Sequence, residues 1–268
     1  MPKAKINGIN MYYELRGDGP QLLYIGGTGG DLRVKPTVFD FPLSRFFTIL
    51  AYDQRGMGQT SKPDIPYTMK DYAEDAYELT KHVGWKSCDV MGVSFGGMVA
   101  QELALRHPDA IRKLVLACTS SGGKGGASYP LHQLPADPEQ RASTLLNILD
   151  TRQNEQWKNT PPEEYQAALR QRTTPSPYEQ EPGYAAGSKR QLEARAGHDT
   201  YDRLPQLRMP TYIYGGKYDG ISPPKNLEAM HSQIPGSKLE FFEGGHLFLG
   251  QDPNAFKRII DFLLQEKA

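Results

Sequence analysis

The sequence predicts an α/β fold in which a mostly parallel sheet carries helices on both faces. Short apolar runs rich in Val, Ile, Leu and Tyr alternate with longer stretches of helical spacing along most of the 268 residues. Several runs are apolar at every position, which is typical of parallel strands buried on both faces. The alternation stops between about residues 122 and 202 and then resumes, so the sequence also predicts a helical insertion.

Each strand of this sheet is predicted from one apolar run. The seven runs, in chain order, are "MYYEL" (11–15), "QLLYIGG" (21–27), "FFTILAYD" (46–53), "CDVMGVS" (88–94), "KLVLACT" (113–119), "PTYIYGG" (210–216) and "KLEFFEGG" (238–245). Between them, residues 68–84, 95–108 and 253–267 have apolar positions at helical spacing. Pro108 and Pro253 mark helix boundaries.

The insertion is predicted to be a helical lid. It opens with "SSGGKGGASYP", contains no convincing strand and carries about four short helical patterns separated by Pro and Gly, such as 137–150 and 161–172. Its apolar residues are too few for a core of its own. We therefore expect residues 122–202 to cover a site on a single main domain, made of residues 1–121 and 203–268.

Composition and charge indicate the kind of partner to expect. The 31 Lys and Arg residues balance 31 Asp and Glu residues, so no overall field favours nucleic acid or an anionic membrane. No apolar stretch approaches the roughly 18 residues of a spanning helix, and the N-terminal stretch lacks the apolar region of a signal peptide. Cys88 and Cys118 lie in short apolar runs, which predicts buried thiols rather than a disulfide or a metal site. We expect a cytoplasmic protein with a small-molecule partner and no metal; its oligomeric state is left open.

A single serine, in "GVSFG" at residues 92–96, raises the question of chemistry. The pentapeptide alone is weak evidence, but here it joins a predicted strand directly to a predicted helix, the setting in which a serine is exposed on a sharp turn. Gly92 and Gly96 are expected because a side chain at either position would collide across the bend. The helix from Phe95 directs its free N–H groups toward charge developing near Ser94. The alternative is an ordinary glycine turn with a structural serine.

A serine nucleophile needs a base and an orienting acid. Of six histidines, His246 follows the last predicted strand after two glycines that give the loop freedom to turn inward, while Asp219 holds the same place after the strand before it. The other five lie near helix ends, in the insertion or in a late helical segment: His82, His107, His132, His198 and His231. Parallel strands end at one edge of a sheet, so we expect Ser94, Asp219 and His246 to converge there. A loop histidine and a structural aspartate are the alternatives.

These motifs together resemble the α/β-hydrolase family over nearly the whole chain. The resemblance is carried by "GPQLLYIGGTGG", "AYDQRGMGQTSKP", "GVSFGGMVAQELALRHPDAIRKLVLACTS", "GGKYDGISPP" and "EGGHLF", in this order. It implies a mostly parallel eight-stranded sheet with a lid inserted after the sixth strand. It also implies that Ser94 is the nucleophile, that His246 is the general base and then the acid, and that Asp219 holds the imidazole. Within this family, the chain resembles the branch of serine esterases and enol-lactonase-like enzymes.

Two loops beside the expected site are interpreted with this resemblance. In "DQRGMGQTS", Asp53, Arg55 and Gly58 are taken as structural residues that shape the loop. The loop "YIGGTGGD" (24–31) lacks the Lys-Ser/Thr pair of a P-loop and the G-x-G-x-x-G spacing, which argues against a nucleotide-dependent enzyme.

The resemblance places the first oxyanion-hole donor in that second loop. The family usually has His-Gly-x there, and this chain has Gly26-Gly27-Thr28 instead. The backbone N–H of Thr28 is the first choice for the donor, with Gly27 next, and the N–H of Phe95 is the second donor. This chemistry requires no cofactor.

Neither the fold nor the three side chains fix the substrate. A serine nucleophile argues against the family's epoxide hydrolases and haloalkane dehalogenases, which use aspartate. Carbon–carbon bond hydrolases commonly have Asn before the serine, so Val93 fits them poorly. The prediction is hydrolysis of a carboxylic ester or lactone through an acyl-enzyme on Ser94. A carbon–carbon bond hydrolase, a cofactor-free haloperoxidase-like enzyme and a non-catalytic small-molecule receptor remain open.

Apolar residues of the lid are candidates for lining an acyl or alcohol pocket. They are Tyr129, Leu131, Leu134, Leu145, Leu146, Leu149, Trp157 and Tyr165, of which we predict Tyr129, Leu131, Leu146 and Trp157 to bind substrate. The alternative for each of them is packing of the lid against the main domain.

Overall fold

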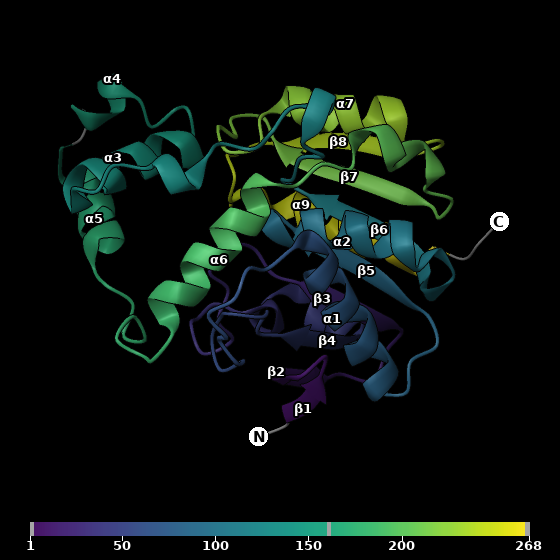
Figure 1. The fold of residues 1–268 in the computed structure, drawn as a ribbon. Helices are drawn as coiled ribbons and strands as arrows, with labels where there is room; N and C mark the ends of the chain where they lie inside the picture. The colour runs from purple at the N-terminus through teal and green to yellow at the C-terminus, as the bar shows by residue number, and fades with distance from the viewer. Residues whose placement is uncertain (1–2, 160–161, 266–268) are drawn as a thin grey trace.

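A computed structural model of the chain, which describes residues 3–159 and 162–265, confirms the α/β fold (Figure 1). Its eight strands form one sheet in the order β1-β2-β4-β3-β5-β6-β7-β8. The six strands from β3 to β8 run parallel, whereas β1 and β2 pair antiparallel at one edge. The strands are β1 (Lys3–Ile6), β2 (Ile9–Arg16), β3 (Gln21–Ile25), β4 (Thr48–Tyr52), β5 (Cys88–Val93), β6 (Ile111–Ala117), β7 (Thr211–Gly216) and β8 (Lys238–Phe242).

Each run predicted as a strand overlaps one of these strands, and β1 is the strand that the apolar runs missed. Only two of its four side chains are buried, because lysines alternate with the apolar residues in "KAKI". A strand this short and this charged gives little apolar signal. Its place at the edge of the sheet, paired with β2 alone, suits that composition.

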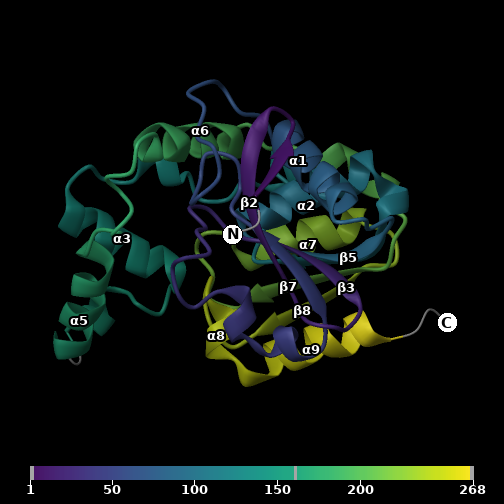
Figure 2. The ribbon, with the colours of Figure 1, turned by 90° about the horizontal axis from the view of Figure 1, so that it is seen from below.

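Helices cover both faces of the sheet (Figures 1 and 2). The α-helices are α1 (Met69–His82), α2 (Phe95–Arg106), α3 (Pro138–Leu149), α4 (Glu155–Lys158), α5 (Pro162–Thr173), α6 (Tyr184–Ala196), α7 (Pro224–Gln233), α8 (Phe248–Gln251) and α9 (Pro253–Leu264). Short 3₁₀ helices span Val38–Asp40, Pro42–Arg45, Pro108–Ala110, Gly123–Gly125, Leu131–Gln133 and Tyr201–Gln206. The three helices predicted outside the insertion, α1, α2 and α9, are confirmed to within a few residues at their ends, except that the predicted end of α9 at residue 267 lies outside the described residues.

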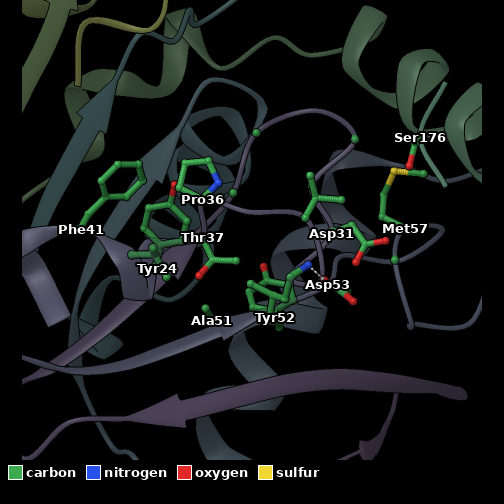
Figure 3. A pocket seen from close by; sticks show the side chains of 18 of the residues that line it. Tyr24, Asp31, Pro36, Thr37, Phe41, Ala51, Tyr52, Asp53, Met57 and Ser176 are labelled. Carbon is green, nitrogen blue, oxygen red and sulfur yellow. Dashed lines mark hydrogen bonds between the residues drawn. The ribbon is translucent and has the colours of Figure 1, made fainter. Parts of the chain in front are cut away.

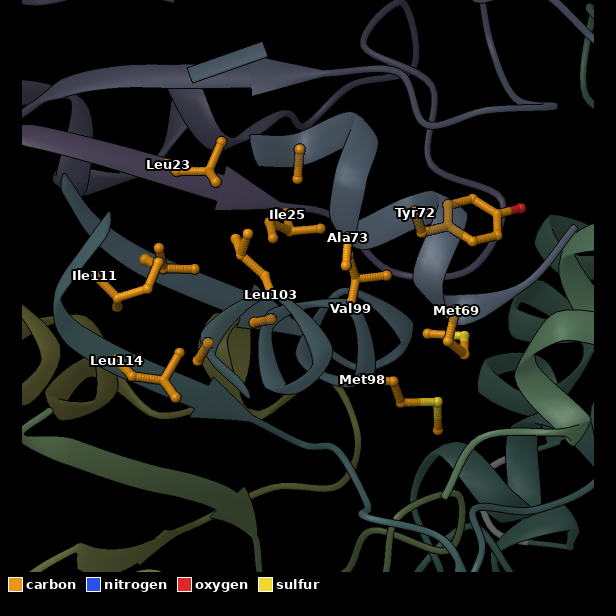
Figure 4. Packing of buried hydrophobic residues seen from close by; sticks show 14 of the residues in the cluster. Leu23, Ile25, Met69, Tyr72, Ala73, Met98, Val99, Leu103, Ile111 and Leu114 are labelled. Carbon is orange, nitrogen blue, oxygen red and sulfur yellow. The ribbon is translucent and has the colours of Figure 1, made fainter. Parts of the chain in front are cut away.

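Successive residues of the central strands face the two apolar layers in turn, as the strand period requires. Leu23 and Leu114 lie in the layer formed with α1, α2 and α7, and Figure 4 shows them on the side where Leu103 of α2 lies. Their neighbours Leu22 and Val115 lie in the other layer, which α9 covers. Burial on both faces explains why these strands are apolar throughout.

The segment between β6 and β7 is helical, and in its described part it forms no strand beyond one isolated bridge between Gly122 and Asp199. The helices α3 to α5 stand to one side of the sheet, whereas α6 runs back alongside the main domain (Figure 1). A small apolar cluster joins α3, α4 and α5 and contains Ala142, Leu146, Trp157, Tyr165, Ala168 and Leu169. The division at residues 122 and 202, and the action of this segment as a lid, stay predictions.

Two further expectations concern burial and membranes. Cys88 and Cys118 are free thiols buried in the main domain, as predicted. Among residues 3–159 and 162–265, no helix has the length and hydropathy needed to cross a bilayer.

Candidate active site

Ser94 stands alone between β5 and α2, on the turn that the pentapeptide predicted. Its backbone has φ 56° and ψ −117°, a conformation that residues with a side chain rarely adopt. The turn is held from both sides, because Ser94 N donates to Ala117 O at 2.8 Å and Thr119 Oγ1 donates to Ser94 O at 2.8 Å. The strand, the turn and the helix together present the hydroxyl at the carboxyl end of a central strand.

The two glycines flanking Ser94 are required by different neighbours. A Cβ on Gly92 would lie 2.3 Å from Gly96 O, so the expected collision across the bend is confirmed at this position. A Cβ on Gly96 would instead meet Ile25 O at 2.0 Å, so the reason given for Gly96 was wrong. Gly96 allows α2 to approach the end of β3, which brings the loop after β3 close to Ser94.

The structure brings the three predicted side chains together. His246 Nε2 lies 2.9 Å from Ser94 Oγ, and His246 Nδ1 lies 2.7 Å from Asp219 Oδ2. Asp219 accepts a hydrogen bond from Nδ1–H, so Nε2 carries no proton and can take the proton of the serine hydroxyl. The side chain of Asp219 is fully buried, while that of His246 is 9% exposed. A buried carboxylate, a nearly buried imidazole and the serine hydroxyl are thus aligned in one row.

Asp219 is fixed by backbone donors as well as by the histidine. Ile221 N and Ser222 N both donate to its Oδ1, at 2.8 and 2.9 Å. The second oxygen, Oδ2, is therefore the one left for His246. The two backbone hydrogen bonds to Oδ1 and the contact of Oδ2 with His246 together set the orientation of the carboxylate.

The end of α3 in the insertion supports both loops, a contact that the sequence did not predict. Ile148 O accepts from Gly220 N at 2.9 Å, and Leu149 O accepts from His246 N at 2.6 Å. A Cβ on Gly220 or on Gly245 would lie 2.8 or 2.0 Å from one of these carbonyl oxygens. The glycine after Asp219 and the glycine before His246 are therefore the sequence signal of this contact, and loop freedom alone does not explain the second.

The loop after β3 lies against Ser94, as the resemblance implied. A Cβ on Gly27 would lie 3.5 Å from Ser94 Cβ. Gln54 Nε2 donates to Gly26 O and Gln191 Oε1 accepts from Gly29 N, both at 2.8 Å, so the loop is held on both sides of Thr28.

The expected oxyanion-hole amides are not engaged elsewhere. Phe95 N begins α2 and so has no acceptor within the helix. The amides of Thr28 and Gly27 donate to no acceptor within the described parts of the chain. An oxyanion hole requires free N–H groups of this kind beside the nucleophile. That these amides form one stays a prediction.

Two cavities adjoin this loop. One of about 190 Å³ is mostly apolar and is lined by Thr28, Gly29, Leu131, Leu134, Arg141, Leu145, Ser188, Gln191 and Leu192. The other, of about 340 Å³, is shown in Figure 3; Gly26, Gly27, Gly29 and Gly30 form one wall, with Tyr24, Phe41, Tyr52 and Asp53 among the other residues. Ser94 and His246 line neither cavity, whereas Gly27 and Thr28 of the loop beside Ser94 each line one.

The four predicted substrate-binding residues are in different settings. Leu131 lines the 190 Å³ cavity together with Thr28. Leu146 and Trp157 pack in the apolar cluster of α3 to α5, within the insertion itself and not against the main domain as the alternative expected. Tyr129 is held by its backbone, since its N donates to Ile221 O at 2.7 Å and its O accepts from Arg195. Their contact with substrate stays a prediction, and Leu131 has the most direct support.

Asp53 and Arg55 make contacts that suit the structural role expected of them. The two oxygens of Asp53 accept from Leu32 N and Gln59 N, at 2.7 and 2.8 Å, which ties the loop after β3 to the loop after β4. Burial raises the pKa of Asp53 to about 6 despite these bonds. Arg55 forms a buried, two-pronged ion pair with Asp75 of α1, with both N···O distances 2.8 Å.

A strained serine turn in a mostly parallel sheet, with an aspartate and a histidine after later strands, defines the α/β-hydrolase class. The chain belongs to the alpha/beta hydrolase fold family, whose model matches residues 20–253. The resemblance noted in the sequence is therefore confirmed.

Individual relatives cover most of the chain. It is 29% identical to a poly(3-hydroxyalkanoate) depolymerase of Ectopseudomonas oleovorans, over 92% of this chain and 85% of that protein. It is 23% identical to 3-oxoadipate enol-lactonase 2 of Acinetobacter baylyi, over 92% and 90% of the two chains. The crystal structure of an enol-lactonase from Burkholderia xenovorans superposes with a TM-score of 0.77 at 22% identity, over 98% of this chain and 100% of the other.

The strain at Ser94 has a measurable consequence for stability. We expect Ser94→Gly to unfold with a free energy about 1 kcal/mol higher than Ser94→Ala, since glycine relieves the positive φ and alanine does not. Urea unfolding of the two variants, both lacking the hydroxyl, measures this difference directly. Equal stabilities would contradict a strained turn.

Proposed function

We propose that the protein is a serine hydrolase that cleaves a carboxylic ester or a lactone of a small molecule through an acyl-enzyme on Ser94. The row from Asp219 Oδ2 to His246 Nδ1, and from His246 Nε2 to Ser94 Oγ, carries the proposal. A serine hydroxyl becomes an effective nucleophile when an oriented imidazole takes its proton. Membership of the hydrolase family and the relatives named for lactone and polyester substrates support the same reaction class.

The reaction begins with attack of Ser94 Oγ on the ester carbonyl while His246 Nε2 takes the hydroxyl proton. The charged imidazole that results is stabilised by Asp219. His246 then gives the proton to the departing alcohol oxygen, leaving an acyl group on Ser94. A water molecule deprotonated by His246 attacks that acyl group, and the acid is released with Ser94 restored.

The oxygen charge that develops in both steps is assigned to the amides of Thr28 and Phe95, with Gly27 as the alternative to Thr28. Loss of one such donor typically costs about 3 to 4 kcal/mol of transition-state stabilisation. Thr28 also lines the 190 Å³ apolar cavity. We place the acyl part of the substrate in that cavity, against Leu131, Leu134 and Leu145.

Two sets of substrates test the proposal: p-nitrophenyl esters of increasing acyl length, and lactones of increasing size. Both are assayed with the wild type and with Ser94→Ala. We expect serine-dependent turnover and a transient mass increase equal to the acyl group on the wild type alone. Ligand-induced thermal stabilisation without turnover would instead indicate a receptor. Cleavage of a carbon–carbon bond without cleavage of any ester or lactone would indicate a carbon–carbon bond hydrolase. Reaction with peroxide without hydrolysis of any ester or lactone would indicate a haloperoxidase-like enzyme.

The hydroxyl of Thr28 offers a test of which group stabilises the oxyanion. Thr28 Oγ1 is buried with no hydrogen-bond partner in the described structure, so it is a second possible donor from the same residue. If the backbone N–H of Thr28 stabilises the oxyanion, Thr28→Val should keep kcat/KM within about threefold of wild type. A loss of a hundredfold or more, with the thermal unfolding temperature unchanged, would transfer the role to the hydroxyl.

A further inference from the structure

Arg195, near the end of α6, is a buried arginine without an acidic partner. The residue is 6% exposed, and its Nη1 donates to Tyr129 O at 2.7 Å. Its Nε and Nη2 are buried and reach no hydrogen-bond acceptor within the described residues. Burial lowers the pKa of Arg195 to about 10, with no carboxylate to oppose the effect, and the guanidinium still carries its charge at pH 7.

The two unused nitrogens form one edge of the guanidinium, and that edge fits a carboxylate. Elsewhere in this chain the same pair of atoms does this: Arg55 Nε and Nη2 hold the two oxygens of Asp75, each at 2.8 Å. An edge-on, two-pronged pair is the geometry in which arginine recognises carboxylates. Burying such an edge unpaired is unfavourable, so a carboxylate placed against it would gain two charge-assisted hydrogen bonds.

Arg195 also lines a small cavity of about 90 Å³. Its lining is Met98, Gly122, Ala127, Ser128, Pro130, His132, Arg195, Ala196 and His198. Burial lowers the pKa of His198 to about 4, so this imidazole is neutral at pH 7 and contributes no charge. The lining contains no Asp or Glu, which leaves the positive charge of Arg195 available to an anion.

This cavity lies close to the proposed active site along two elements. Met98 is one turn into α2 from Ser94, and Met98 N donates to Ser94 O. Gln191 is one turn before Arg195 in α6, and it holds Gly29 of the loop that carries Thr28. Its Nε2, like Thr28 Oγ1, is buried without a partner in the described part of the chain, so unpaired polar groups extend from that loop toward Arg195. A separation of four residues along an α-helix corresponds to a rise of about 6 Å.

We propose that the cavity between α2 and α6 binds a carboxylate group, held edge-on by Arg195. Where this group belongs to the substrate, the proposal rests on the proposed function and narrows the substrate to esters or lactones that carry a free carboxylate several atoms from the scissile carbonyl. The other source is a separate small carboxylic acid bound at the same place.

Binding is tested without turnover, in Ser94→Ala. Sodium glutarate is expected to raise the thermal unfolding temperature of this variant, and the neutral glutaramide is not. The shift should disappear in Ser94→Ala/Arg195→Met and persist in Ser94→Ala/Arg190→Met, where the arginine removed lies on the same helix but pairs with Asp64 and Glu193 on the surface. Titration calorimetry of the same variants is expected to show at least a tenfold weaker dissociation constant with Met at position 195.

Catalysis then identifies the source of the carboxylate. Wild type is expected to hydrolyse monomethyl glutarate with a kcat/KM at least tenfold above that of methyl pentanoate. Arg195→Met should remove this preference, and the control Arg190→Met should keep it. The monomethyl esters of succinate and adipate, which are one methylene shorter and one longer, test the distance between the bound carboxylate and the scissile carbonyl. Arginine-dependent glutarate binding without any substrate preference supports the site and assigns it to a separate acid.

A purely structural role for Arg195 predicts the opposite pattern. Glutarate would then stabilise Ser94→Ala and Ser94→Ala/Arg195→Met alike, and that result overturns the proposal. If Arg195→Met does not fold, Arg195→Lys replaces it, since lysine keeps the charge without the two-pronged edge and should still weaken glutarate binding. An inactive wild type that binds glutarate through Arg195 would overturn the proposed function and leave the carboxylate site standing.

Discussion

Replacement of Ser94 by alanine is expected to abolish ester hydrolysis, with a fall in kcat on the order of 10⁵ to 10⁶. The variant keeps the Cβ and the strained turn but loses the oxygen that His246 Nε2 contacts at 2.9 Å. Neither the imidazole nor the free amides can then form an acyl-enzyme. Initial rates with p-nitrophenyl butyrate, together with intact mass spectra after substrate addition, measure the loss of both turnover and adduct.

A matched control for this variant is Ser143→Ala, which removes a hydroxyl from α3 that makes no hydrogen bond among the described residues. It should retain wild-type rates. Turnover by Ser94→Ala above about a hundredth of the wild-type rate would show that another group attacks the ester. That result would refute the acyl-enzyme on Ser94.

Asp219→Asn is expected to lower kcat by about 10⁴ while leaving the fold intact. The reason lies in the two oxygens of the carboxylate. Ile221 N and Ser222 N donate to Oδ1, so the amide oxygen of asparagine must take that position and its NH₂ must face His246. An NH₂ donor obliges His246 Nδ1 to accept, which places the ring proton on Nε2 and prevents Nε2 from taking the proton of Ser94.

Steady-state kinetics and thermal unfolding of this variant separate chemistry from stability. Asp202→Asn, at an exposed carboxylate paired with Lys124, is the control and should behave as wild type in both measurements. If Asp219→Asn stayed within tenfold of the wild-type rate, the carboxylate would not set the proton position on His246. The row of three side chains would then be a structural contact rather than the source of activity.

The parts of the site that the sequence predicted are those that follow directly from strand ends. Ser94, Asp219 and His246 each come just after an apolar run, and parallel strands deliver their ends to one edge of the sheet. The family resemblance added Thr28, which no local pattern marks. The edge strand β1 was missed because its lysines break the apolar pattern.

What the sequence could not indicate are contacts between distant segments that are made by backbone or by single polar side chains. Gln191 reaches Gly29 across 162 positions of the chain, and Arg195 is exceptional only because nothing acidic among the described residues folds beside it. Spacing and composition carry no information on such pairings. Leu146 and Trp157 show the same limit for apolar residues, since facing a pocket and facing one another produce the same helical pattern.

The contact between α3 and the loops of Asp219 and His246 constrains how the protein can be re-engineered. Because Ile148 O and Leu149 O accept from the amides of Gly220 and His246, an exchange of the whole insertion for that of another hydrolase would remove two supports of the proposed proton relay. A chimaera with its graft points at residues 122 and 202 would therefore lose rate on every substrate alike. Grafting only the stretch beyond Asp150 would leave these supports in place and alter substrate choice separately.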